Sequence, residues 1–151
     1  MLVYITIRFE AITGISAVLC LLHDLLVILT AYTLFRIPMS TTFIAAILTI
    51  LGYSINATII VFDRVRENMK LIRKTGFADI VNKSIWQTFA RSVNTSLTTL
   101  FTVLILYFLG VPSIKAFALP IIIGIVAGTY SSVFMSGNIW VLLKQKLPAK
   151  R

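Results

Sequence analysis

The sequence predicts an all-α membrane protein, a polytopic bundle whose helices cross the bilayer several times. Hydrophobic residues make up 58% of the 151 residues and charged residues only 13%, with a mean hydropathy of +0.96. A soluble domain is nearer half apolar and a quarter charged. Several apolar stretches also reach the length of about 20 residues that a membrane-spanning helix needs. Because lipid offers the backbone no hydrogen-bond partners, such spans must be helices.

We expect one transmembrane domain over residues 1–151. Residues 1–8 are predicted to be the end of a truncated span, since their apolar run is too short to cross alone. The turns around Pro38 and Pro112 contain residues typical of tight turns, so neighbouring spans should form two helical hairpins. The full spans are expected at about 11–35, 41–63, 92–110 and 116–143.

The basic residues are distributed unevenly between the two sides of this arrangement. All fourteen Lys and Arg residues except Arg36 and Lys115 lie on the same side as the loop between the second and third spans. Basic residues gather in cytoplasmic loops of membrane proteins. The long middle loop and the C-terminus are therefore predicted to be cytoplasmic.

The segment at about 66–91 is expected to be a cytoplasmic amphipathic element. Apolar side chains recur there at three- and four-residue spacing, from Phe77 to Phe89, with basic residues beside them. The favoured interpretation is a helix lying in the membrane interface, with Trp86 at headgroup depth. The alternative is that residues 76–91 simply extend the third span into the cytoplasm.

Composition excludes several classes of function. With one Cys, one His and five acidic residues, neither a disulfide framework nor a multi-histidine metal site is available within the chain. The net charge of +9 reflects basic residues that flank apolar spans, which is not the pattern of a nucleic-acid-binding protein. Five acidic residues also leave few candidates for general acid–base catalysis, so we expect neither an enzyme nor a metal, cofactor or nucleic-acid partner.

Asp24 is the strongest candidate functional residue, because charged side chains inside a span are costly and generally functional. It could take part in proton movement or in a contact that a transport cycle makes and breaks. It could equally be a carboxyl group that only locks helix packing. His23 is expected to be a hydrogen-bonded packing residue on a different face, since successive helical residues differ by about 100°.

The second span carries polar residues in its apolar stretch. Asn56 lies well inside it, and Gly52 and Tyr53 precede it. Polar side chains at such positions hydrogen-bond between helices, and a glycine allows a close helix approach or a bend. Interhelical bonding is the favoured interpretation and a hydrated path the alternative. At the end of the span, Asp63, Arg64 and Glu67 are spaced to form a charged helix end.

The third and fourth spans add two further patterns. Arg91 precedes a run of small polar residues that includes Thr95, which suits either helix capping or a polar face against a neighbouring span. Gly124 and Gly128 have the spacing that lets two helix backbones approach closely.

Taken together, these residues resemble the SecF family, the smaller subunit of the bacterial SecD–SecF protein-export complex, in the resistance-nodulation-division superfamily. The resemblance covers essentially the whole chain. It implies the C-terminal part of such a subunit, one half of a pseudo-symmetric transmembrane domain. It rests on Arg8-Phe9-Glu10 with Leu22-His23-Asp24, on Gly52-Tyr53-Ser54-Ile55-Asn56 with Asp63-Arg64-Val65-Arg66-Glu67-Asn68, and on Arg91, residues 94–99, Gly124 and residues 128–132.

The resemblance implies a role in export across the bacterial inner membrane. SecD would be the other half, and together the two would use the proton-motive force to assist late translocation through the SecYEG channel, after SecA. Exported polypeptides and membrane lipids are the further partners implied. Asp24, Asn56, Arg91 and Thr95 would then belong to a proton-coupling centre between the halves.

Ala57 departs from the family pattern, which usually reads Asn-Asp-Thr where this chain reads Asn56-Ala57-Thr58. Alanine cannot carry a proton, and the favoured interpretation is that the partner half supplies the carboxylate. The alternatives are that Asp24 carries more of the proton transfer, or that coupling is weaker in this protein. Two other functions remain: another transporter of the superfamily that exports lipids or drugs, and a structural subunit without proton coupling.

Overall fold

The computed structural model describes residues 11–71 and 76–146, and all the elements in these ranges are helices. The predicted all-α fold class is confirmed. The proposed end of a span at residues 1–8 lies outside the described residues. In chain order the elements are α2 (Ala11–Leu34), α3 (Thr41–Leu71), α4 (Phe77–Leu109), α5 (Pro112–Tyr130), the π-helical turn η1 (Ser131–Met135) and α6 (Ser136–Lys146).

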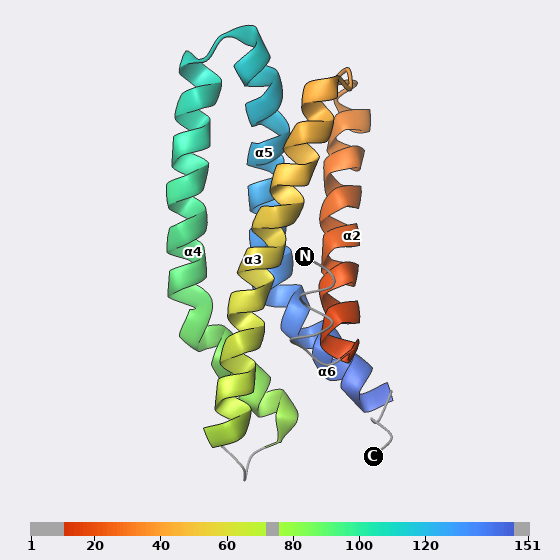
Figure 1. Ribbon diagram of the computed structural model, residues 1–151, viewed down its shortest axis with the longest axis vertical. Coiled ribbons are helices and arrows are strands. Elements are labelled where there is room, and N and C mark those ends of the chain that lie inside the picture. The colour runs from red at the N-terminus through yellow and green to blue at the C-terminus, as the bar shows by residue number, and fades with distance from the viewer. Residues whose placement is uncertain (1–10, 72–75, 147–151) are drawn as a thin grey trace.

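Four continuous helical stretches are long and apolar enough to cross a membrane. Figure 1 shows two hairpins, α2 with α3 and α4 with α5, whose tight turns lie at the same end of the bundle. Helix α5 contacts α2, α3 and α4 and so holds the two hairpins together. The four stretches are Ile12–Leu34, Thr41–Leu71, Phe77–Leu109 and Pro112–Lys146.

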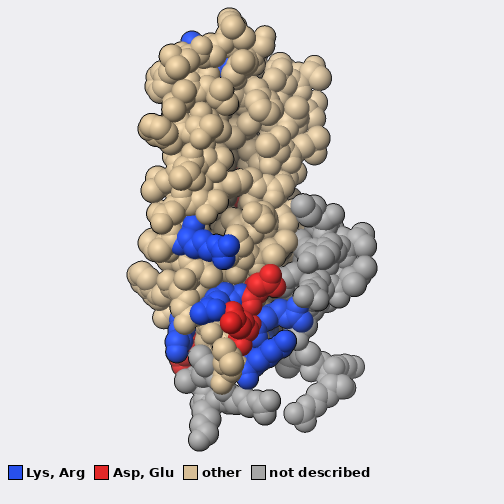
Figure 2. All heavy atoms as spheres, turned by 60° about the vertical axis from the view of Figure 1, so that its left-hand side comes forward, with Lys and Arg blue, Asp and Glu red and all other residues tan. Residues whose placement is uncertain are grey.

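The charged residues gather at the end of the bundle opposite those turns. Figure 2 shows Lys, Arg, Asp and Glu side chains grouped there, while the turn end shows very few. This is the end at which α3 finishes and α4 begins (Figure 1). The surface between the two ends is mostly uncharged, as lipid contact requires.

The structure corrects the expectation of a separate amphipathic element at 66–91. Helix α3 continues to Leu71, and α4 starts at Phe77 and runs without a break into the third span. Its apolar residues Phe77, Val81 and Ile85 pack against a cluster around Trp140. The apolar stripe is therefore buried against α3 and α6. Periodicity alone predicts an apolar helix face, but it does not show whether that face contacts protein or lipid.

Two apolar clusters fill the interior. The one nearer the hairpin turns includes Ile28, Ile50 and Ile125, and the one nearer the charged end includes Ala17 and Trp140. A layer of buried polar side chains lies between the two apolar clusters, on α2 and along the fourth span. On α3, Ser54 belongs to this layer, because it lies between Ile50 of one cluster and Ile55 of the other. Fully buried polar side chains of this layer are Asp24, Ser54, Ser131, Ser132 and Ser136.

Close packing between α3 and α5 depends on a glycine. A Cβ atom added at Gly124 would lie 2.5–2.7 Å from three side-chain atoms of the buried Ile50. The predicted close helix approach is therefore found at Gly124. It is not found at Gly52, where nothing lies within 4 Å of such an atom.

Candidate functional site

Asp24 lies at the centre of the buried polar layer. Within residues 11–71 and 76–146 it is the only Asp, Glu, Lys or Arg whose side chain is buried, with an exposed fraction of 0%. The Ser54 hydroxyl donates a hydrogen bond to Asp24 Oδ2 at 2.5 Å, which joins α2 to α3. A buried carboxyl group needs such partners because its removal from water is costly. This environment is compatible with both alternatives for Asp24, a group that takes part in proton movement and a carboxyl group that locks helix packing.

His23 contacts Asp24 although the two residues lie on different faces of α2. The distance from His23 Nδ1 to Asp24 Oδ1 is 3.3 Å, and the His23 side chain is about a third exposed, at 32%. The imidazole lines an apolar cavity of about 640 Å³ together with Val27 and Tyr130. His23 therefore contacts the buried carboxyl group and also lines a cavity beside α2 and α5. The spacing of the two residues along the helix did not predict that their side chains touch.

Gly128 brings α5 close to the Asp24 carboxyl group. A Cβ atom at this position would lie 3.4 Å from Ser54 Oγ and 3.6 Å from Asp24 Oδ2. The nearest atom would be Ser54 Cβ at 3.3 Å, which is tighter than most contacts of a Cβ atom. The absence of a side chain at Gly128 therefore lets α5 lie close to Ser54 and Asp24. Gly124 and Gly128 thus have separate roles, the first in packing and the second beside the carboxyl group.

The π-helical turn Ser131–Met135 completes the polar layer from the fourth span. Thr58 Oγ1 and Ser132 Oγ lie 3.0 Å apart, and the Ser132 hydroxyl is also 3.3 Å from the Ser54 carbonyl oxygen. The Ser136 hydroxyl donates to the Ser132 carbonyl oxygen at 2.5 Å. Single π-helical turns within α-helices are often found at functional sites.

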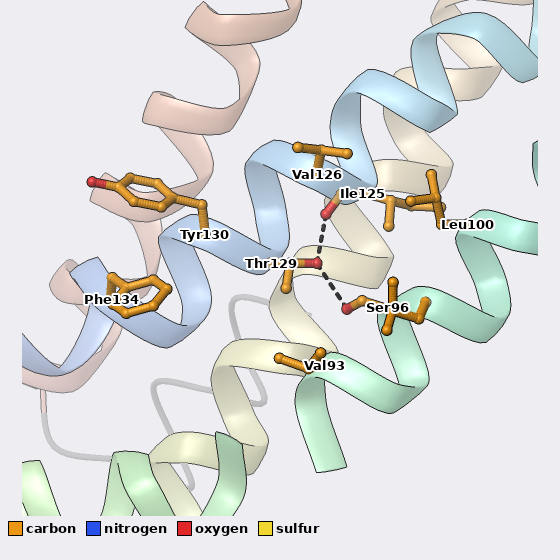
Figure 3. A pocket seen from close by; sticks show the side chains of 9 residues that line it. Val93, Ser96, Leu100, Ile125, Val126, Thr129, Tyr130 and Phe134 are labelled. Atoms are coloured by element: carbon orange, nitrogen blue, oxygen red, sulfur yellow. Dashed lines mark hydrogen bonds between the residues drawn. The ribbon is translucent and has the colours of Figure 1, made fainter. Parts of the chain in front are cut away.

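A second polar contact joins α3, α4 and α5 beside the first. The Tyr53 hydroxyl donates to Ser96 Oγ at 3.2 Å, and the Thr129 hydroxyl lies 2.7 Å from the same oxygen. Figure 3 shows the Ser96–Thr129 contact at an otherwise mainly apolar cavity of about 270 Å³, lined by side chains that include Val93, Leu100 and Tyr130. Tyr53 is thus an interhelical hydrogen-bond donor, as expected for polar residues of this span.

Asn56, Arg91 and Thr95 lie elsewhere, on exposed surface of α3 and α4. The Thr95 hydroxyl donates a hydrogen bond within its own helix, to the Arg91 carbonyl oxygen at 2.8 Å. None of the three side chains forms a hydrogen bond or ion pair with Asp24. The predicted proton-coupling residues therefore divide into a buried site around Asp24 and an exposed face.

This exposed face continues into a charged groove. Arg91 lines a cavity of about 250 Å³ that also includes Asp63, Arg64 and Glu67. Arg64 Nη1 lies 2.6 Å from Glu67 Oε2, and its Nε donates to Gln87 Oε1 at 2.8 Å. The predicted charged helix end is present, and it is tied to α4 through Gln87.

Sequence patterns placed Ser96 in a polar run, and Ser131 and Ser132 in the family motif, but they assigned none of them to a polar layer around Asp24, and they did not single out Ser136. The serines at 131, 132 and 136 include a pair four residues apart, the spacing that places side chains on one helix face. That spacing could have indicated a polar helix face, but it could not show that this face lies beside Asp24. Among the described residues, no three His, Cys, Asp or Glu side chains are grouped so as to hold a metal ion.

Comparison with known proteins identifies the family. Residues 1–146 match the family described as "Protein export membrane protein SecD/SecF, C-terminal". The chain belongs to the SecD/SecF family. It is 48% identical over 147 residues to the protein translocase subunit SecF of Alicyclobacillus acidocaldarius, covering 95% of this chain and 48% of that protein.

Fused SecDF proteins match the same region. The chain is 46% identical to the SecDF subunit of Bacillus subtilis, across 95% of this chain and 20% of that protein. The crystal structure of SecDF from Thermus thermophilus, titled a translocon-associated membrane protein, aligns with a TM-score of 0.90 and 45% identity. That alignment covers 95% of this chain and 20% of the solved one. The chain thus spans about half the length of a separate SecF and a fifth of a SecDF.

Proposed function

We propose that this chain is the membrane part of an accessory subunit of the bacterial Sec protein-export machinery. Its relatives are named protein translocase subunits, at identities of 43–48% over nearly the whole chain. The subunit would work with SecD and use the proton-motive force to assist the late translocation of exported polypeptides. SecYEG and the SecA pathway supply the channel and the earlier steps in this proposal.

The exposed polar face of α3 and α4 supports SecD as a partner. Asn56 and Thr95 lie within segments that are apolar enough to cross a membrane, yet their side chains are exposed in the isolated chain. Polar groups facing lipid are costly, so a second membrane protein should cover them. SecD-type and SecF-type halves occur in one polypeptide in the SecDF relatives, which makes SecD the natural candidate.

The buried site around Asp24 carries the proposal of proton coupling. Asp24 is an ionisable group with an exposed fraction of 0%, hydrogen-bonded to Ser54 and 3.3 Å from an imidazole nitrogen. A carboxyl group in such a place changes its partners when it gains or loses a proton. Intramembrane carboxyl groups of this kind are used as proton relays.

The charge distribution supports the proposed location and orientation. Basic residues are concentrated at the end of the bundle where α3 and α6 finish. That end would face the cytoplasm in the bacterial inner membrane, with the two hairpin turns on the other side.

The partner proposal is tested by purification. The tagged full-length protein, extracted in mild detergent, should carry SecD with it, and mass spectrometry of the purified material identifies the partner. Recovery of the protein alone, or with an outer-membrane efflux partner, would contradict the export role. It would favour a lipid or drug transporter of the same superfamily.

Replacing Arg91 with alanine is expected to reduce export to the level of a strain that lacks the subunit. Arg91 is exposed and has no ion-pair partner among the described residues, so its removal should leave the fold unchanged. Arg91→Lys, which keeps the charge, should retain part of the activity. The measurement is the rate of secretion of a reporter protein in cells. Normal secretion with Arg91→Ala would remove this residue from the coupling centre.

Replacing Ala57 with aspartate is expected to be tolerated. Ala57 is half-buried beside the exposed Asn56, so a carboxylate there can reach the surface that we assign to SecD. Secretion should therefore stay close to the wild-type rate. The alanine also favours the alternative of a structural subunit without proton coupling. Full secretion in both Arg91→Ala and Asp24→Asn would establish that alternative.

A further inference from the structure

His23 connects the buried polar layer with the surface of the bundle. The Asp24 side chain is fully buried, whereas the His23 side chain is 32% exposed. Successive residues on a helix point about 100° apart, so these two neighbours reach different surroundings from the middle of α2. His23 Nδ1 nevertheless lies 3.3 Å from Asp24 Oδ1. The pair therefore forms a direct contact between the inside of the bundle and its outer face.

The other contacts of Asp24 stay inside the bundle. Asp24 Oδ2 accepts a hydrogen bond from the Ser54 hydroxyl of α3, and Ser54 is itself fully buried. Gly128 of α5, which is also buried, faces the same oxygen. Among the described residues, His23 is thus the one hydrogen-bond partner of Asp24 that is partly exposed. A proton that moves along hydrogen bonds between Asp24 and the outer face has to pass through this imidazole.

A cavity of about 640 Å³ lies on the outer side of His23, between α2 and α5. Its walls are aliphatic apart from His23 and Tyr130, whose ring centroids are 6.4 Å apart. In Figure 3 the Tyr130 ring extends from α5 away from Ser96 and α4. His23 Nε2 has no hydrogen-bond partner among the described residues, and such a group is costly inside a membrane span. Because one water molecule requires only ~10–15 Å³, the cavity has room for water that satisfies this nitrogen.

The surroundings of His23 contain few other titratable groups. Among the described residues that line the cavity there is no Lys, Arg, Asp or Glu, and Tyr130 of α5 is the only titratable one besides His23. Cys20, one turn before Asp24 on α2, is buried, and its thiol lies 4.0 Å from the Ser131 carbonyl oxygen. Within the described part of the chain, Asp24 is therefore the one acidic group in contact with the imidazole.

We propose that His23 passes protons between Asp24 and the cavity beside α2 and α5. This inference rests on the proposed proton coupling at Asp24. In the inward direction, His23 Nε2 takes a proton from a hydronium ion in the cavity, and Nδ1 gives its own proton to the ionised Asp24 Oδ1. A water molecule, a neutral imidazole and a neutral carboxyl group remain. Rotation of the ring toward the cavity then lets water return a proton to Nδ1 and remove the one on Nε2. Imidazole is a common proton shuttle because each ring nitrogen can bind or release a proton.

The test compares two substitutions of equal shape, His23→Gln and His23→Glu, in the full-length protein reconstituted with SecD in liposomes. Proton flux under an imposed gradient is measured with a pH-sensitive dye. Glutamine can still donate a hydrogen bond to Asp24 but cannot carry a proton. Flux should therefore fall about 100-fold, at the lower end of what a positioned proton-transfer group contributes. Glutamate can carry a proton and should retain more flux than glutamine. A purely structural role predicts the reverse order, because a second carboxylate beside Asp24 adds repulsion.

Thr30→Val is the matched control on the same helix. Thr30 is exposed on α2 outside the cavity, and its hydroxyl donates to the Leu26 carbonyl oxygen, so flux should equal that of the wild type. The melting temperatures of both His23 variants should stay close to the wild-type value, because this side chain reaches the surface. Loss of folded protein in both variants would assign His23 to packing.

The outcomes separate this inference from the proton coupling on which it rests. If Asp24→Asn blocks flux while His23→Gln conducts as the wild type does, or conducts better than His23→Glu, only the role of His23 is overturned. If the wild type shows no flux, or Asp24→Asn conducts normally, the proposed proton coupling fails and the role of His23 fails with it.

Discussion

Replacing Asp24 with asparagine is expected to abolish the contribution of this subunit to protein export while leaving its fold intact. Asparagine has nearly the same shape, and its amide oxygen can still accept the hydrogen bond from Ser54 that now measures 2.5 Å. What it loses is the ability to bind and release a proton. The expected result is secretion at the level of a strain without the subunit, measured with a reporter protein.

The matched control for this substitution is Asp79→Asn. Asp79 is an exposed carboxylate in the first turn of α4, away from the buried polar layer, so secretion should be unaffected. The amount and melting temperature of each purified variant show whether folding has changed. If Asp24→Asn is stable and secretes normally, Asp24 is a packing residue and the proton-coupling proposal fails.

Replacing Gly124 with alanine is expected to produce the largest loss of stability among single-methyl additions to α5. The new Cβ would lie 2.5–2.7 Å from three atoms of Ile50, a buried β-branched side chain with few alternative rotamers. Helices α3 and α5 would have to move apart. Overpacking of this kind costs about 1–3 kcal/mol. The measurement is thermal unfolding of the full-length protein in detergent.

Gly52→Ala is the matched control for that experiment. Nothing lies within 4 Å of a Cβ atom at Gly52, although this glycine is also inside a spanning helix. Alanine there should be neutral or slightly stabilising, because it favours the helix by up to about 1 kcal/mol over glycine. Equal melting temperatures for Gly124→Ala and Gly52→Ala would contradict the packing described for α3 and α5.

Sequence patterns were sufficient for the all-α class, because long apolar stretches in a bilayer have few structural solutions. They also singled out Asp24, because an ionisable side chain inside a membrane span is costly and is usually kept for a function. They did not reveal what each helix face contacts. The stripe from Phe77 to Ile85 is periodic in the same way whether it meets lipid or the cluster around Trp140.

The separation of the candidate residues also lay beyond the sequence. Asn56 and Ser54 are two residues apart on α3, yet Ser54 is buried against Asp24 and Asn56 is exposed. Helix geometry predicts that they face different ways, but not which one faces the interior. The π-helical turn is a further case, because the spacing of its residues does not show that Ser132 contacts Ser54 and Thr58 across the bundle.

The most direct test of proton coupling is proton flux through the reconstituted complex. The full-length protein with its SecD partner would be placed in liposomes containing a pH-sensitive dye, with a proton gradient imposed across the membrane. We predict that the wild type and Asp79→Asn dissipate the gradient and that Asp24→Asn does not. Equal flux in wild type and Asp24→Asn would contradict the assignment of Asp24 to the proton path.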